Sequence, residues 1–559
     1  MSATRNLVVV LFGGMLCLLL PRSAQAQKFY PDDPIREDRD DLPIEKPGVL
    51  DLSPTYDAIE NSFVNQVEGP IPRAMNVNTI GDVPDSSWFT NRIGVRTMSV
   101  EELVRGPNRP NQVGGGPDLS EPVTVISAKI GGITPGLVVR DRRGNVYYVK
   151  FDPRAHPNLS TAADVIGTLF FHAIGYNVPE NYITYFRLDD FTIEPGAEVT
   201  LSGGRTAPLN WTYVASMLEA AAHHADGSVR AVASLAVSGA ALGPFKFYGT
   251  RPDDPNDIFP HEHRRELRGY RVFCAWLHHD DSRAVNTFDA FSETGDGRGY
   301  VRHYLIDFGS ILGSGSSVRR NIAPQDPRAG NEYLFEIPPM LKTAYTFGIW
   351  ERPWMNVPYA YPQYPEIGRI ESDFFQPDTW KPEYPNAAFN RTLPDDAFWA
   401  AKIVASFSDE AIRAIVHQGG YLDPEAERFL ADTIIVRRDK VVAHYFMEVN
   451  PLDAFRVEGS SLEFRNLGEE RGLSATRSYE YAWFVFDNNT SALTSLTDGE
   501  STQPNLAIPA SDEPYLMIRI RTRSEAAPKW GLAVEVYLGR GNGGRSVAGV
   551  EQEIEPVSP

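Results

Sequence analysis

The sequence predicts an α+β protein with three consecutive parts: a β-rich segment, a largely helical segment and a second β-rich segment. Three observations support this prediction. Apolar and polar residues alternate at strand spacing between residues 121 and 151, apolar residues recur at helical spacing in several stretches between 160 and 447, and strand-like runs return from about residue 455. Helices and strands that are segregated along the chain are typical of the α+β class.

The chain begins with the features of a secretory signal peptide. Arg5 precedes an apolar run that ends at Leu20, and Ala24-Gln25-Ala26 forms a cleavage site of the A-x-A type. The run is too short for a membrane span, and no later stretch is apolar enough to span a bilayer. Cys17 lacks the small residue that normally precedes a lipidated cysteine, so a lipoprotein is the weaker alternative. We expect cleavage after Ala26 and export to the periplasm, the envelope or the exterior of a bacterial cell.

Charge and cysteine content restrict the partners of the mature chain. Removal of residues 1–26 takes away Arg5 and Arg22, which leaves 51 of the 53 basic residues against 73 acidic ones, a net charge of −22. Such a chain is a poor match for nucleic acid or anionic lipid as its main partner. Cys274 is the one cysteine that remains. An internal disulfide is therefore excluded.

The first β-rich segment follows a charged, proline-rich leader and a Gly/Pro/Asn-rich linker. The runs "PVTVISAKI", "GLVVRD" and "VYYVKFD" alternate as strands, and "RDRRGN" joins the last two as a hairpin turn. Next, "STAADVIGTLFFHAIG" places its apolar residues at helical spacing. We expect this helix to start at Ser160 or Thr161 and to stop at Gly175.

Helical patterns dominate the middle of the chain. A strand ("NYITYFRLDD") precedes helices at "LNWTYVASMLEAAAHHA" and "HEHRRELRGYRVFCAWLHH". Two further helices are expected, one over "PDDAFWAAKIVASFSDEAIRAIVHQGG" and one over "DPEAERFLADTIIVRRDKVVAHYF". The strand-like runs after residue 455 then predict a small sandwich-like domain at the C-terminus.

A polar loop and a short motif stand out between the helices. The stretch "WLHHDDSRAVNTFDAF" (276–291) contains His279, Asp281 and Asn286 in the pattern H-x-D-x-x-x-x-N, and "HYLIDFGS" then places Asp307 after an apolar strand as Asp-Phe-Gly. Taken alone, D-x-x-x-x-N is common and fits an ordinary turn. Its order relative to Asp-Phe-Gly and to the upstream strand ending in Lys150 is what gives the pattern weight.

This order of strands, glycine turn, strand lysine, helix, polar loop and Asp-Phe-Gly resembles the protein-kinase-like fold over residues 120–445. The resemblance is closer to atypical branches (HipA-type, CotH-type and phosphoinositide kinases) than to typical protein kinases. It implies a two-lobed core. The expected divisions are a signal peptide (1–26), a leader and linker (27–118), a β-rich N-lobe (119–190), a helical C-lobe (191–450) and a β-rich C-terminal domain (451–559).

The resemblance implies a nucleotide site on the N-lobe. Lys150 would reach the α- and β-phosphates of ATP, Asp164 would pair with Lys150, and the turn "KIGGITPG" would bring backbone at Gly131, Gly132 and Gly136 close to phosphates. Each residue also has a simpler explanation. Lys150 fits a surface lysine at a strand end, the glycines fit a structural turn, and Thr161-Ala-Ala-Asp164 fits a capping box.

The resemblance also implies the chemical roles in the loop. Asp281 would accept or orient the proton of the attacking hydroxyl, Arg283 would steady the γ-phosphate, and Asn286 and Asp307 would hold Mg²⁺ or Mn²⁺. Two departures limit the analogy with typical protein kinases. Asp280 stands where H-R-D has arginine, and no clear A-P-E follows Asp-Phe-Gly, since "IAPQ" (322–325) is a poor substitute. A platform for protein substrates is therefore not implied.

Three functions remain open from the sequence. The leading expectation is ATP-dependent phosphoryl transfer to a hydroxyl of a protein, glycan or small molecule. The first alternative is an inactive pseudokinase that serves as a binding or scaffold module in the cell envelope, where free ATP is scarce. The second is a metal hydrolase built on His278, His279, Asp280 and Asp281 with "HEH" (261–263), although adjacent ligands point in different directions.

Overall fold

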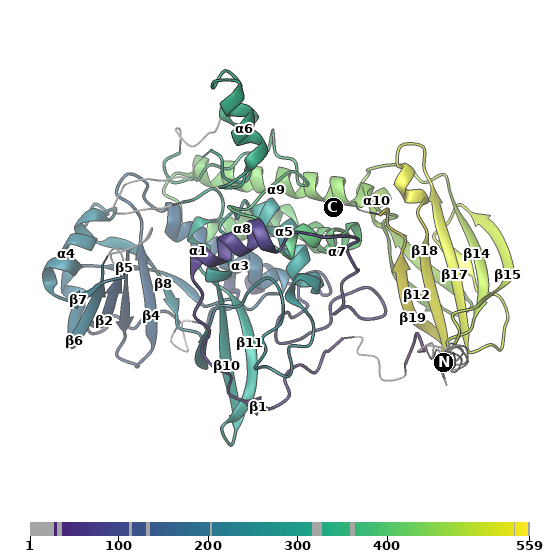
Figure 1. The fold of residues 1–559 in the computed structure, drawn as a ribbon, viewed down its shortest axis with the longest axis horizontal. Helices are drawn as coiled ribbons and strands as arrows, with labels where there is room; N and C mark the ends of the chain where they lie inside the picture. The colour runs from purple at the N-terminus through teal and green to yellow at the C-terminus, as the bar shows by residue number, and fades with distance from the viewer. Residues whose placement is uncertain are drawn as a thin grey trace, which may run out of the picture.

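The computed structural model describes residues 27–30, 36–110, 115–129, 135–201, 204–315, 327–357, 364–541 and 543–556. The predicted signal peptide lies outside these residues. The described chain is mixed α+β with several sheets, as the sequence predicts. A sheet lies at one end, a helical part in the middle and a second β region at the other end (Figure 1). In the described ranges, no helix has both the length and the apolar character needed to cross a bilayer.

The first sheet has seven strands in the order β5-β8-β4-β3-β2-β6-β7. All neighbours are antiparallel except β2 and β6. The strands extend past residue 190, the expected end of the N-lobe, as far as Leu235. They are β2 (Val123–Lys129), β3 (Gly136–Arg140), β4 (Val146–Phe151), β5 (Asn181–Phe186), β6 (Phe191–Thr200), β7 (Thr206–Pro208) and β8 (Val229–Leu235).

Alternation along β4 orients Lys150. Tyr147, Val149 and Phe151 are buried in the core of the sheet, whereas Tyr148 and Lys150 lie on the opposite, more open face. A strand period of two puts Tyr148 and Lys150 on the same face. Helix α4 (Trp211–Ala220) contributes Val214 to the same core.

Helix α3 (Leu159–Ile174) follows β4 and begins one residue earlier than expected. Asp152 caps it: its Oδ1 accepts hydrogen bonds from the amides of Ser160 (2.8 Å) and Thr161 (2.9 Å). The Thr161 hydroxyl also donates to Asp152, at 2.6 Å. The capping-box explanation of Asp164 is therefore wrong, because Asp152 satisfies the free amides of the first turn. The helix ends at Gly175 as predicted, with φ at 144°.

Over the described residues, the helical part contains seven further α-helices, two of them short, and a four-stranded sheet in the order β1-β11-β10-β9. One expected helix is split in two, because Ser408 accepts a hydrogen bond from the amide of Ala411 (3.1 Å) and starts a new helix there. The elements are α1 (Pro54–Ile59), α2 (Val100–Arg105), α5 (Arg265–Leu277), α6 (Ile337–Tyr345), α7 (Pro394–Ala405), α8 (Asp409–His417), α9 (Pro424–Met447), β1 (Ile44–Glu45), β9 (Ala240–Gly243), β10 (Thr287–Gly295) and β11 (Arg298–Leu305).

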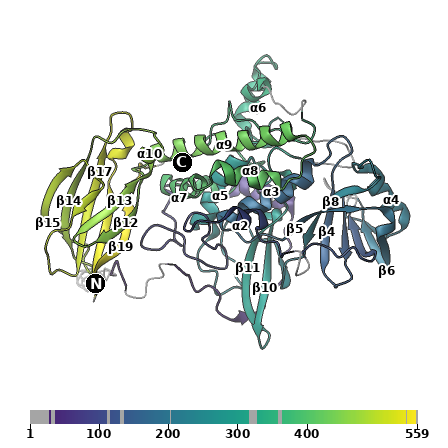
Figure 2. The same ribbon diagram turned by 180° about the vertical axis from the view of Figure 1, so that it is seen from behind.

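The C-terminal region forms two sheets that share one apolar core, and it lies beside α10 (Leu467–Glu470) at the end of α9 (Figure 2). Phe29 from the start of the described chain also packs onto it, against Tyr515 and Tyr537. The strands are β12 (Leu452–Glu458), β13 (Ser461–Asn466), β14 (Ser478–Phe486), β15 (Leu493–Ser501), β16 (Asn505–Ala507), β17 (Tyr515–Arg523), β18 (Val534–Gly541) and β19 (Gly544–Gln552).

Candidate functional site

Lys150 lies between two carboxylates from different parts of the chain. Its Nζ is 2.6 Å from Oδ1 of Asp307, which follows β11, and 3.5 Å from Oδ2 of Asp164 on α3. Burial disfavours the ammonium, but the charges of Asp307 and Asp164 outweigh it and raise the pKa of Lys150 above its ordinary value. The expected pairing with Asp164 is thus present. Lys150 is not the unattached surface lysine of the simpler explanation.

Asp164 also anchors the backbone of the Asp-Phe-Gly motif. Its Oδ1 accepts hydrogen bonds from the amide of Phe308 (3.1 Å) and from Nδ2 of Asn181 (3.1 Å). The carboxylate is buried, and burial raises its pKa although Lys150 acts in the opposite direction. Asp164 therefore connects helix α3, strand β4 and the segment after β11 in one polar cluster.

Asp307 adopts a left-handed backbone conformation, with φ at 62° and ψ at 64°. Phe308 next to it is fully buried and stacks on Phe171 of α3, with ring centroids 5.0 Å apart. Gly167 makes room for this packing, since a Cβ there would lie 2.7 Å from the Cβ of Phe308. The buried phenyl ring fixes the turn, and the turn leaves 46% of the Asp307 side chain exposed. Burial would raise the pKa of Asp307, but the charge of Lys150 lowers it overall.

The polar loop starts where α5 ends, at His278, which has φ at 52°. Asp281 forms an ion pair with Nε of Arg283 and accepts a hydrogen bond from the hydroxyl of Ser310 at 3.4 Å. Nδ2 of Asn286 donates to the backbone carbonyl of Asp281 at 2.7 Å. This last bond explains the spacing of five residues, because it closes the loop on itself.

The electrostatics of Asp281 differ from those of an ordinary surface aspartate. Burial raises its pKa to about 6, and the nearby charges of Asp307 and Glu383 add to the increase, whereas Arg283 opposes it. Asp307 is therefore close enough to Asp281 to disfavour its ionisation. A carboxylate with this pKa is mostly ionised at neutral pH, yet it is a stronger base than a surface aspartate.

The glycine turn is only partly described. Gly136 pairs directly with Lys150 in the sheet, and a Cβ at Gly136 would lie 2.8 Å from the carbonyl oxygen of Val149. Glycine is thus required there by strand packing. Gly131 and Gly132 lie outside the described residues, and so does "IAPQ".

Two contributors to the site were not found from the sequence. Glu383 lies 3.2 Å from Nη1 of Arg283, and its amide donates to the carbonyl of Asp280 at 2.9 Å. Asp152 positions α3 through its cap. Aspartate just before a helix is a recognisable capping signal, but Asp152 lies seven residues before Leu159. Nothing in the sequence near Glu383 associates it with the loop.

The residues of the metal-hydrolase alternative do not gather around one point. His279 is buried between aromatic rings, and burial lowers its pKa to about 3, so it is neutral. His261 pairs with Asp257 instead, at 2.7 Å. Within the described part of the chain, no three His, Cys, Asp or Glu side chains come together as a metal-binding group.

Comparisons with models of protein families, with curated proteins and with solved structures gave no match to this chain. The functional interpretation therefore depends on the geometry of the site.

Proposed function

We propose that residues 119–450 form a two-lobed kinase-like core that transfers the γ-phosphoryl group of ATP to a hydroxyl of a protein, glycan or small molecule. The observation that carries this proposal is the position of Lys150 within 2.6 Å of Asp307, with Asp281 and Asn286 in the adjoining loop. Phosphoryl transfer depends mainly on positioning and charge neutralisation, which a lysine, two aspartates and an asparagine supply.

The residues present fit a magnesium nucleotide. Mg²⁺ is usually held by one or two protein oxygen ligands together with phosphate oxygens and water, so a cluster of three protein ligands is not required. Asp307 has a half-exposed carboxylate. Asn286 has an amide oxygen and lies in the polar loop, where it bonds to Asp281. These two residues would hold Mg²⁺ or Mn²⁺, and Lys150 would bind the phosphates. Bound Mg-ATP would supply the transferable phosphoryl group.

The chain's own residues account for the other requirements. Asp281 accepts the proton of the acceptor hydroxyl, because its raised pKa makes it a base suited to neutral pH. Arg283 keeps Asp281 ionised and places a positive charge next to it. Asp164 holds both Lys150 and the amide of Phe308, which fixes the spacing of Lys150 and Asp307.

One observation favours the pseudokinase alternative. Lys150 and Asp307 neutralise each other directly, and Arg283 is held by Asp281 and Glu383 at the same time. A nucleotide would have to separate these pairs, at a free-energy cost. A protein that keeps them paired would act as an envelope binding or scaffold module without turnover.

Nucleotide binding by the mature chain tests the proposal. Titration calorimetry with ATP should detect binding that requires Mg²⁺ or Mn²⁺ and that Asp307→Ala abolishes. Asp512→Ala is a matched control, because Asp512 is an exposed carboxylate paired with Arg540 in the C-terminal region. If the unmodified chain binds neither ATP nor GTP with either metal, the kinase proposal is rejected and the scaffold alternative replaces it.

A further inference from the structure

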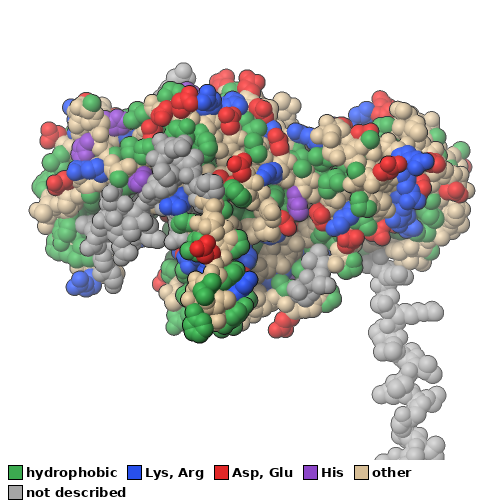
Figure 3. All heavy atoms as spheres, turned by 90° about the horizontal axis from the view of Figure 1, so that it is seen from above, with side chains coloured by type: hydrophobic (Ala, Val, Ile, Leu, Met, Phe, Trp, Pro, Cys, Tyr) green, Lys and Arg blue, Asp and Glu red, His purple; other side chains and the backbone are tan. Residues whose placement is uncertain are grey.

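Helix α6 and the turn after it expose an unusual number of apolar side chains. We call residues 335–355 the α6 projection, because the helix extends away from the rest of the molecule (Figure 1). Phe347 and Ile349 at the turn are 93% and 85% exposed. The large apolar residues of the projection that are exposed are Phe335, Ile337, Met340, Leu341, Tyr345, Phe347, Ile349 and Met355. Figure 3 views the molecule from the side on which α6 projects, and hydrophobic side chains gather on a protruding part of that face.

The backbone at the turn adopts left-handed conformations at two consecutive residues. Phe347 has φ at 54° and Gly348 has φ at 79°. The left-handed region is natural for glycine but costly for a bulky aromatic residue. Burial of the phenyl ring does not offset the strain within the molecule, since the ring is almost fully exposed. A strained conformation that presents an apolar ring to water indicates a partner outside the molecule.

The base of the projection is firmly attached. Glu332 pairs with Arg352 and accepts a hydrogen bond from Nε1 of Trp354 at 3.0 Å. Glu336 pairs with Lys381 at 2.7 Å. The exposed tip is therefore carried on a base with several polar contacts.

The charge of the tip differs from that of the whole chain. Residues 337–350 contain no acidic side chain and one lysine, although the chain has 73 acidic residues among 559. Lys342 lies 4.2 Å from the ring centroid of Trp350, so its charge stays close to an aromatic surface. Aromatic residues, aliphatic residues and a single lysine at one tip are typical of segments that enter the interfacial region of a bilayer.

We propose that the α6 projection binds the surface of a zwitterionic lipid bilayer, with Phe347 and Ile349 inserted among the lipids. The tip is a convex turn, and fluid lipid accommodates such a shape without a complementary pocket. Net attraction to anionic lipid is not expected, because the chain from Gln27 onward carries a net charge of −22. This inference does not depend on the proposed phosphoryl transfer.

Vesicle flotation of the chain from Gln27 onward provides the first test. With phosphatidylcholine vesicles, the protein should float with the lipid, and the binding should change little with added salt or phosphatidylglycerol because apolar contacts carry it. Phe347→Ser/Ile349→Ser should weaken the partition coefficient by about tenfold or more, as expected for two apolar side chains withdrawn from water. Ile258→Ser/Leu422→Ser is the matched control, since both residues are exposed apolar side chains elsewhere (68% and 63%).

A fluorescent label provides the second test and does not depend on how a double variant folds. Cys274 is buried, so Ile349→Cys gives one accessible thiol for an environment-sensitive dye. Its emission should shift to shorter wavelength when vesicles are added, whereas the same dye at Leu422→Cys should not respond. The proposal is overturned if the unmodified chain stays with the soluble fraction or if the dye at 349 shows no shift. Self-association that Phe347→Ser/Ile349→Ser abolishes, in place of vesicle binding, would identify a second copy of the chain as the partner instead.

Discussion

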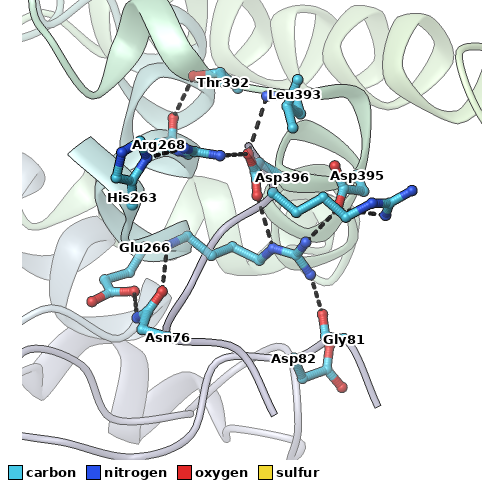
Figure 4. Close-up of polar contacts among 12 residues, drawn as sticks. Asn76, Gly81, Asp82, His263, Glu266, Arg268, Thr392, Leu393, Asp395 and Asp396 are labelled. Atoms are coloured by element: carbon cyan, nitrogen blue, oxygen red, sulfur yellow. Dashed lines mark hydrogen bonds and ion pairs between the residues drawn. The ribbon is translucent and has the colours of Figure 1, made fainter. Parts of the chain in front are cut away.

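Two clusters of buried charge in this protein have similar composition but different surroundings. The first is the candidate site, where Lys150 meets Asp164 and Asp307. The second joins α5 to α7 through Arg268 and Asp396, which face each other in Figure 4. Arg268 and Asp396 are both fully buried, whereas Asp307 in the candidate site keeps 46% of its side chain exposed.

In the second cluster, Figure 4 shows Asp396 surrounded by hydrogen-bond donors. Asp396 accepts hydrogen bonds from Arg265 (2.9 Å), Arg268 (3.2 Å) and the amide of Leu393 (3.0 Å). Arg265 also reaches the carbonyl of Gly81, which ties the N-terminal segment to the helices. The network is closed around Asp396, whose buried carboxylate is held by its three donors, so it holds elements together and is not open to a ligand. The comparison indicates that an exposed carboxylate, more than the presence of buried charge, distinguishes the candidate site from the structural cluster.

The largest expected effect concerns turnover at the open site. Asp281→Asn keeps the shape of the side chain but removes the base, so the phosphoryl-transfer rate should fall by about 10²–10⁴-fold. ATP affinity should stay within a few-fold, because in the proposed function Asp281 contacts the acceptor and not the nucleotide. Rate measurements and calorimetry on the same preparation separate the two quantities. A parent chain that binds ATP without turnover, and that Asp281→Asn leaves unaltered, would identify a pseudokinase.

The next effect contrasts the stability contributions of the two clusters. Asp396→Asn leaves two buried arginines without their shared carboxylate, so it should lower the free energy of unfolding by about 3–5 kcal/mol. Asp307→Asn should change it by no more than about 1 kcal/mol, because half-exposed ion pairs contribute little. Urea denaturation of both variants measures the difference. Equal losses would show that the candidate site is as structural as the closed cluster.

The smallest effect is a shift in pH dependence. In the proposed function Asp281 is the base, so kcat/KM should be low below pH 6 and rise to a plateau as Asp281 ionises, with an apparent pKa near 6. Arg283 lowers the pKa of Asp281 and Glu383 raises it. Arg283→Ala should therefore move the acid limb to higher pH, and Glu383→Gln should move it to lower pH. Arg283→Lys keeps the charge and serves as the control; a limb that none of these variants moves would not belong to Asp281.

The sequence alone was informative wherever the signal is local. Alternation along β4 predicts that Tyr148 and Lys150 share one face, as they do, and the helical period with Gly175 located α3 and its end. The sequence also predicted which residues would form the candidate site: Lys150, Asp164, Asp281, Asn286 and Asp307, in this order along the chain. Two caps were missed: Asp152 lies seven residues before α3 and replaces its expected cap. Ser408 is a local cap, but it divides a helix that periodicity alone would continue.

Only the tertiary structure decided which of these residues meet. Lys150 and Asp307 are 157 positions apart, and their contact depends on the burial of Phe308 against α3. Glu383 reaches Arg283 from a segment with no recognisable motif. The physical reason is that periodicity and capping arise from residues within a few positions of one another. Closure of a long loop depends on the packing of many distant side chains, and no short stretch of sequence records that packing.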